Sequence, residues 1–172
     1  ANSGCLFFEG LIDEDINKEF LNDIGHTDID DVDNIQHYFQ NIKSSSSIPR
    51  IPAGTALKDA YPLNSPLEKI FKNEIVSGAI NSLVGSKTVV DHQFLHLTFP
   101  SKYYAKANQR QMSQVNHQDS TIDPRTTFDI QLFYFPTAVT KEMGGTRYIP
   151  GTHLRIVNEM GIAKYQNKKK KK

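Results

Sequence analysis

The first half of the chain carries apolar residues at the spacing of amphipathic helices. Between positions 12 and 24 they recur every three or four residues, which predicts a helix that Asp13 caps and Gly25 ends. Positions 32–42 repeat this spacing more weakly. A further helix is predicted from Ser65, where Ser-Pro-Leu-Glu combines a capping residue, a first-turn proline and a capping-box glutamate. Its apolar face comprises Leu67, Ile70, Phe71, Ile75, Ala79 and Leu83.

From position 88 onward the apolar pattern alternates with a period of two, which is typical of strands. Residues 95–99, 128–135 and 146–149 are the predicted strands, each bounded by proline or glycine. An earlier apolar run at 6–8 predicts a short buried strand. Helices followed by a run of strands indicate an α+β fold, with an antiparallel sandwich or barrel behind a helical N-terminal layer.

Composition narrows the functional classes. The 172 residues, 38% of them hydrophobic, predict one soluble domain over 1–167. Lysines 168–172 change the formal net charge from −4 to +1, and we interpret them as a disordered tail. The single cysteine, Cys5, excludes a disulfide-framed secreted fold. We expect a cytoplasmic protein that binds neither membrane nor nucleic acid, because long apolar runs and basic stripes interleaved with aromatics are lacking.

His117 and Asp119 are the main candidates for chemistry. On a strand, residues i and i+2 point to the same face, so an imidazole nitrogen and a carboxylate oxygen would enter one cavity. These donors are two of the three ligands in the 2-His-1-carboxylate triad that binds non-haem Fe(II). A hydrogen-bonded surface pair is the alternative interpretation of His-X-Asp when it stands alone.

A second segment changes that balance. Residues 144–153 read Gly-Gly-Thr-Arg-Tyr-Ile-Pro-Gly-Thr-His. Together with His117-Gln118-Asp119, this segment resembles the phytanoyl-CoA dioxygenase family, whose members carry His-X-Asp, a hydrophobic strand and then a glycine-led segment ending in Pro-Gly-Ser/Thr-His. Residues 4–12 are similar to the family's first strand and helix. The resemblance therefore covers roughly residues 4–154.

The resemblance implies a double-stranded β-helix, the jelly-roll or cupin-like fold. It also implies Fe(II), the cosubstrates 2-oxoglutarate and dioxygen, and hydroxylation of an unactivated C–H bond in a small organic substrate. By this resemblance His117 and Asp119 match the first two iron ligands. Phe133 stands near a bulky residue beside 2-oxoglutarate, and a core aromatic is the alternative for it. Asp119 favours hydroxylation over halogenation, because halogenating relatives lack that carboxylate.

The chain departs from the family pattern after the Pro-Gly-Thr-His segment. Members place a second histidine ligand several strands further on, followed by an arginine that binds the distal carboxylate of 2-oxoglutarate. Here His153 is the one histidine after Asp119, and it aligns with the turn itself. We expect it to be a structural turn histidine, with a substitute third iron ligand as the alternative.

We therefore expect a C-terminally truncated oxygenase domain whose open sheet edges promote self-association. The alternative function is a non-catalytic jelly-roll remnant or binding module, and a lysine-tailed scaffold for acidic partners is a third option. The sequence leaves open whether this chain is an active enzyme. Arg147 and Lys102 are candidate substrate-facing cations, with exposed surface charge as the alternative. His92 and His96 would lie about 13 Å apart on a strand, which is too far for one metal ion.

Overall fold

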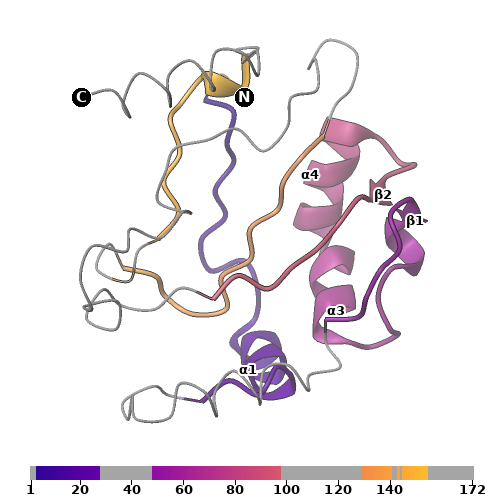
Figure 1. Ribbon diagram of the computed structural model, residues 1–172, viewed down its shortest axis with the longest axis vertical. Coiled ribbons are helices and arrows are strands. Elements are labelled where there is room, and N and C mark those ends of the chain that lie inside the picture. The colour runs from indigo at the N-terminus through magenta and orange to yellow at the C-terminus, as the bar shows by residue number, and fades with distance from the viewer. Residues whose placement is uncertain (1–2, 28–47, 98–128, 141–142, 144, 155–172) are drawn as a thin grey trace, which may run out of the picture. The chain divides into compact units, whose positions relative to one another are not determined.

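The structure, a computed structural model, describes residues 3–27, 48–97, 129–140, 143 and 145–154 (Figure 1). The elements are α1 (Glu14–Asp23), β1 (Thr55–Ala56), η2 (Leu57–Asp59), α3 (Pro66–Lys72), α4 (Glu74–Val84), β2 (Val89–Val90) and η6 (Thr152–Leu154). These residues divide between two compact units. We call the first the turn unit, with described residues 3–8, 129 and 146–154, and the second the helical unit, with 9–27, 48–97, 130–140, 143 and 145.

Helix α1 forms where the apolar spacing predicts it. Asp13 is its N-cap residue, but the backbone carbonyl of Asp13, and not its carboxylate, accepts the first hydrogen bonds, from the amides of Ile16 and Asn17. Gly25, with a φ of 71°, turns the chain out of the helix. Phe20 is buried on the inner side of α1, and Ile24 is buried just beyond its end.

The segment after Ser65 forms two helices, so the prediction of one continuous helix is wrong. The helical conformation is interrupted at Asn73, whose ψ of 129° is not helical. The Asn73 side chain accepts hydrogen bonds from the amides of Ile75 (3.0 Å) and Val76 (3.2 Å) and thereby starts α4. The break changes which side of the second helix faces inward. Val76 and Ile80 are buried, whereas Ile75, which the single-helix pattern placed inside, is 52% exposed.

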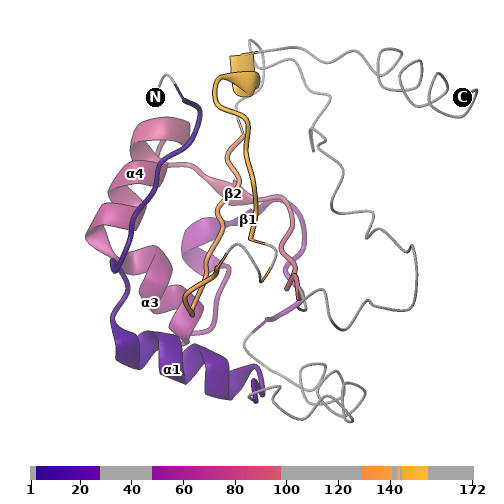
Figure 2. The ribbon, with the colours of Figure 1, turned by 90° about the vertical axis from the view of Figure 1, so that its left-hand side faces the viewer.

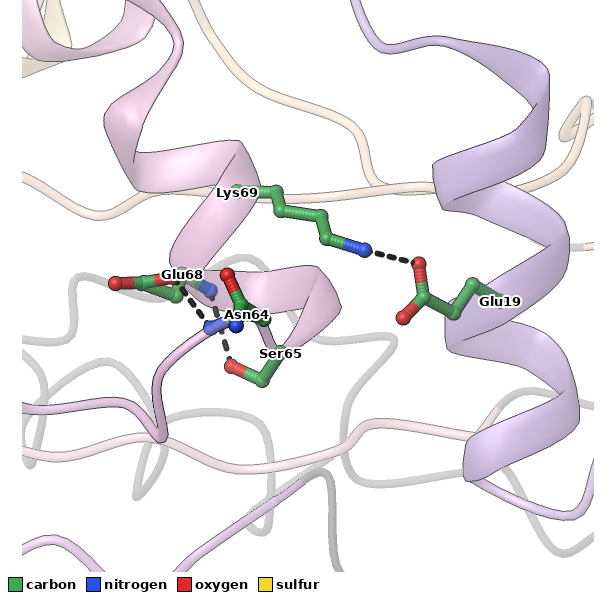
Figure 3. A network of polar contacts seen from close by, with 5 residues as sticks. All are labelled: Glu19, Asn64, Ser65, Glu68 and Lys69. Atoms are coloured by element: carbon green, nitrogen blue, oxygen red, sulfur yellow. Dashed lines mark hydrogen bonds and ion pairs between the residues drawn. The ribbon is translucent and has the colours of Figure 1, made fainter.

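The start of α3 uses a variant of the predicted capping box (Figure 3). Ser65 Oγ accepts a hydrogen bond from the Glu68 amide at 3.3 Å, as expected for a capping serine. Glu68 Oε2 accepts from the amide of Asn64 at 2.7 Å, one residue before the usual partner. On the next residue, the Lys69 ammonium forms an ion pair with Glu19 of α1, which ties the two helices together.

The described residues contain a two-stranded antiparallel sheet, in which Thr55 pairs with Val90 and Ala56 with Val89. Figure 2 shows this sheet beside α3 and α4 of the same unit. Helices with an antiparallel sheet agree with the α+β prediction. After β2, residues 93, 95 and 97 are partly buried while 92, 94 and 96 are exposed, so the predicted alternation is present although no strand is assigned there.

Residues 130–135, 146–149 and 6–8 also carry no assigned strand. A strand requires a ladder of backbone hydrogen bonds to a neighbour, and these segments form none with another described segment. The prediction that 6–8 is buried is wrong, because Leu6, Phe7 and Phe8 are 49–77% exposed.

Tyr61 joins the helices of the helical unit to the chain after β2. Its ring stacks on Phe71 of α3, with ring centroids 4.9 Å apart. Its hydroxyl donates to Gln93 Oε1 at 2.8 Å, and Gln93 Nε2 donates to the Pro49 carbonyl. Burial raises the pKa of Tyr61 to about 12, since an ionised phenolate loses solvation inside the unit.

Several predicted features lie outside the described residues: the helix at 32–42, Phe99 at the end of its strand, Lys102, and the lysine tail 168–172. Within the described ranges, no helix has both the length and the apolar character needed to cross a membrane.

Candidate functional site

The two predicted iron ligands, His117 and Asp119, lie outside the described residues. The described ranges contain no group of three or more His, Cys, Asp or Glu side chains arranged to hold a metal ion. Two segments that follow the ligands in the sequence, 129–140 and 145–154, are described, and they contain Phe133 and the Pro-Gly-Thr-His residues.

Tyr134 fixes the first of these segments to α1. Its hydroxyl donates a hydrogen bond to Asn17 Oδ1 at 2.6 Å. Its ring meets Phe20 edge-on, with centroids 5.2 Å apart and an interplanar angle of 77°. Burial raises the pKa of Tyr134 to about 12, so the hydroxyl stays protonated and able to donate to a higher pH than an exposed tyrosine does.

Phe133 and Phe135 flank this anchor and lie together. Their rings are nearly parallel, at 7°, with centroids 6.3 Å apart. They are 53% and 48% exposed, whereas Tyr134 between them is partly buried against α1. Alternate residues of an extended segment point to opposite sides, which explains this arrangement. Phe133 is thus not a core aromatic of the described helical unit, so the interpretation of Phe133 as a core residue is wrong for that unit.

The Pro150-Gly151 pair forms a tight turn in the turn unit. The amide and hydroxyl of Thr152 both donate to the Ile149 carbonyl, at 3.3 and 2.8 Å. Gly151 has a φ of 77°, and proline followed by a left-handed glycine is the residue pattern of a type II turn. The local sequence therefore dictates the geometry of this turn, and η6 begins directly after it.

His153 follows the turn and packs on the beginning of the chain. Its ring lies so close to the Gly4 backbone that a Cβ atom on residue 4 would sit 2.1 Å from His153 Nδ1. The Gly151 amide donates to the Ser3 carbonyl at 2.9 Å. Phe7 and Tyr148 have ring centroids 6.1 Å apart. These contacts agree with the expected role of His153 as a structural turn residue.

The remaining predicted polar residues that the structure describes, His92, His96 and Arg147, lie on exposed surface. The Phe94 ring lies 5.9 Å from that of His92 and 6.2 Å from that of His96, measured between centroids. His92 Nδ1 is bonded to Asp91 at 2.8 Å. The interpretation of these histidines as polar-face residues is confirmed. Arg147 is exposed, as the surface-charge alternative requires.

Comparison with known proteins gives the class of this chain. The sequence model of the family described as phytanoyl-CoA dioxygenase (PhyH) matches residues 2–172, which is nearly the whole chain. The chain therefore belongs to the phytanoyl-CoA dioxygenase family. Membership implies, in general, Fe(II)- and 2-oxoglutarate-dependent oxygenase activity on a small molecule with dioxygen, and a cupin-like fold. A search of curated proteins found no match, and a search of solved structures found none either.

Proposed function

We propose that this chain is an oxygenase domain that hydroxylates an unactivated C–H bond of a small organic substrate. The observation that carries the proposal is the family match over residues 2–172, joined to the presence of His117-Gln118-Asp119 upstream of Pro150-Gly151-Thr152-His153. In this proposal His117 and Asp119 hold Fe(II), since imidazole and carboxylate are donors that suit it. The bound iron, with 2-oxoglutarate, supplies the oxidising power for inserting an oxygen atom from dioxygen into the substrate.

The described part of the chain contributes an apolar surface to this proposal. In this proposal Phe133 would lie beside 2-oxoglutarate, and the Phe135 ring, which is nearly parallel to it, would extend the same surface. Support comes from the half-exposed rings, which are available for contact, and from Tyr134, whose bond to Asn17 fixes the intervening residue. An apolar wall of this kind limits the access of water to a reacting centre.

The proposal includes a double-stranded β-helix over 1–167 as the scaffold and a cytoplasmic location. The alternating exposure at 92–97 and the opposed sides of Tyr134 and its neighbours support extended segments of the kind that this fold assembles. The lone Cys5 is in keeping with a reducing compartment. Self-association through exposed strand edges is part of the same proposal.

The direct test is anaerobic titration of the full chain with Fe(II) and 2-oxoglutarate, followed through the visible charge-transfer band of the ternary complex. We expect a band in the parent chain that is lost in His117→Ala and Asp119→Ala. His96→Ala is the matched control, because His96 is exposed and lies outside the motif. A band of equal strength in all four proteins would refute the assigned ligands.

A non-catalytic binding module is the second candidate. The observation that favours it is His153, the one histidine in the sequence after Asp119, whose ring is packed on Gly4. If His153 has this packing role, none of the residues after Asp119 in this sequence supplies a second histidine ligand for iron. Absence of the band from the parent chain, with Fe(II) lost on desalting, would support this candidate over the oxygenase.

A further inference from the structure

We infer that residues 3–7 act as a strap that holds the turn at 149–153 in place. The close contact between the His153 ring and the Gly4 backbone, which we call the fastening, secures this strap. This inference goes beyond the proposed function, because it assigns His153 to positioning the chain and not to binding iron. It rests on contacts within the turn unit alone.

Three contacts join the two segments. Ser3 accepts the hydrogen bond of the Gly151 amide, Gly4 meets His153, and Phe7 lies beside Tyr148 further along. The partners of residues 3, 4 and 7 are residues 151, 153 and 148, so the contacts form no regular ladder. The contacts are of different kinds, a backbone hydrogen bond, a close ring–backbone approach and an aromatic pair, so the alignment does not depend on any one of them.

The fastening requires glycine at position 4 for two separate reasons. Its φ of 77° is a left-handed conformation that side chains disfavour. A Cβ there would also approach His153 Nδ1 to 2.1 Å, far inside van der Waals contact. Gly10 separates these effects, because it has a similar φ of 64° and nothing within 4 Å of its added Cβ.

The same contact limits what else His153 can do. Its Nδ1 is the ring atom nearest the added Cβ position on Gly4. The contact therefore takes up the Nδ1 side of the ring. The strap role and an iron-ligand role are separable by experiment, because hydrogen exchange at Gly151 reports the first and the charge-transfer band reports the second.

The closing experiment follows hydrogen exchange at the Gly151 amide in the full chain, since that N–H donates to Ser3. In Gly4→Ala we expect exchange at least tenfold faster than in the parent, and in His153→Ala a rise of several-fold. Gly10→Ala has the same backbone penalty elsewhere and should leave this amide unchanged. His96→Ala controls for the loss of an exposed histidine.

The double variant Gly4→Ala/His153→Ala tests the contact itself. Removing the His153 ring relieves the clash with the Cβ atom of residue 4. In the His153→Ala background, the change in global unfolding rate caused by Gly4→Ala should therefore be no larger than the change caused by Gly10→Ala. Equal effects of Gly4→Ala with and without His153 would overturn the inference. An unchanged exchange rate at the Gly151 amide in His153→Ala would also overturn the inference. This second test leaves the strained Gly4 in place.

The iron titration distinguishes this inference from the proposed function. His153→Ala should keep the charge-transfer band of the parent chain. Loss of the band with Gly151 still protected would make His153 a ligand and refute its role in the strap. If the parent chain shows no band, the oxygenase proposal fails, while the exchange measurements still decide the strap.

Discussion

Replacing Asn73 with alanine tests the reasoning about the break between α3 and α4. The substitution removes the acceptor of two backbone N–H groups, those of Ile75 and Val76. Loss of an N-cap side chain typically costs about 0.5–2 kcal/mol of unfolding free energy. We expect a value in the upper half of that range, since the Val76 hydrogen bond is part-buried and water replaces it poorly.

Fusion of the two helices would not rescue the variant. In a continuous helix each residue advances by about 100°, so Ile70 and Val76 would point about 120° apart. Both are buried in the observed structure, at 2% and 8% exposure. One uninterrupted helix would have to expose one of them, and burial of such a side chain is worth about 1.5–3 kcal/mol.

The assay is urea unfolding monitored by far-ultraviolet circular dichroism. Asn73→Asp and Asn73→Ser keep an acceptor and should retain most of the parent stability. Asn81→Ala is the matched control, because Asn81 is an exposed residue within α4 where alanine favours the helix. The reasoning is refuted if Asn73→Ala is as stable as the parent chain and shows a stronger helical signal.

Three further predictions concern ionisable groups. Tyr134→Phe removes the hydroxyl that bonds Asn17 and should lower the unfolding free energy by about 0.5–1.5 kcal/mol, measured by urea unfolding; a neutral result would contradict a formed hydrogen bond. Folding raises the pKa of Tyr61 and of Tyr134 from 10.0 to about 12. Their contribution to the unfolding free energy is therefore complete below pH 10 and is lost as the pH rises toward 12. The phenylalanine variants should show a smaller loss of stability over this pH range. The pKa of Glu68 is lowered by its hydrogen bond with Lys72 and then by the Asn64 amide, so its contribution to stability is present above the ordinary glutamate pKa of 4.5 and is lost as the pH falls through the folded pKa. Glu68→Gln should flatten this acid limb in a pH series of thermal midpoints.

Local signals in the sequence predicted local structure well. The Ser65-to-Glu68 pattern located the start of α3, and proline with glycine located the turn that the Thr152 hydrogen bonds close. The break at Asn73 was missed because the apolar spacing continues across it. A signal was present, since asparagine followed by glutamate is itself a helix-start pattern.

Features that depend on distant residues were less predictable. The alternation after position 91 correctly gave the side-chain directions, which are a local property, but not the extent of pairing, which needs a partner. The run at 6–8 was assigned as buried on apolarity alone. For the candidate site, motif and family resemblance supplied His117, Asp119 and Phe133. Neither could reveal that Tyr134 bonds Asn17, 117 positions away in the sequence.

Helix α1 is held by polar side chains to two segments that are remote from it in the sequence. Asn17 holds Tyr134, and Glu19, two residues later, holds Lys69 of α3. The Phe133 and Phe135 rings flank Tyr134, so the contact between Tyr134 and α1 also links the position of these two rings to that of the helix. A shift or rotation of α1 would carry the tyrosine with it and tilt the aromatic pair, so the N-terminal helix sets the orientation of a surface more than a hundred residues downstream.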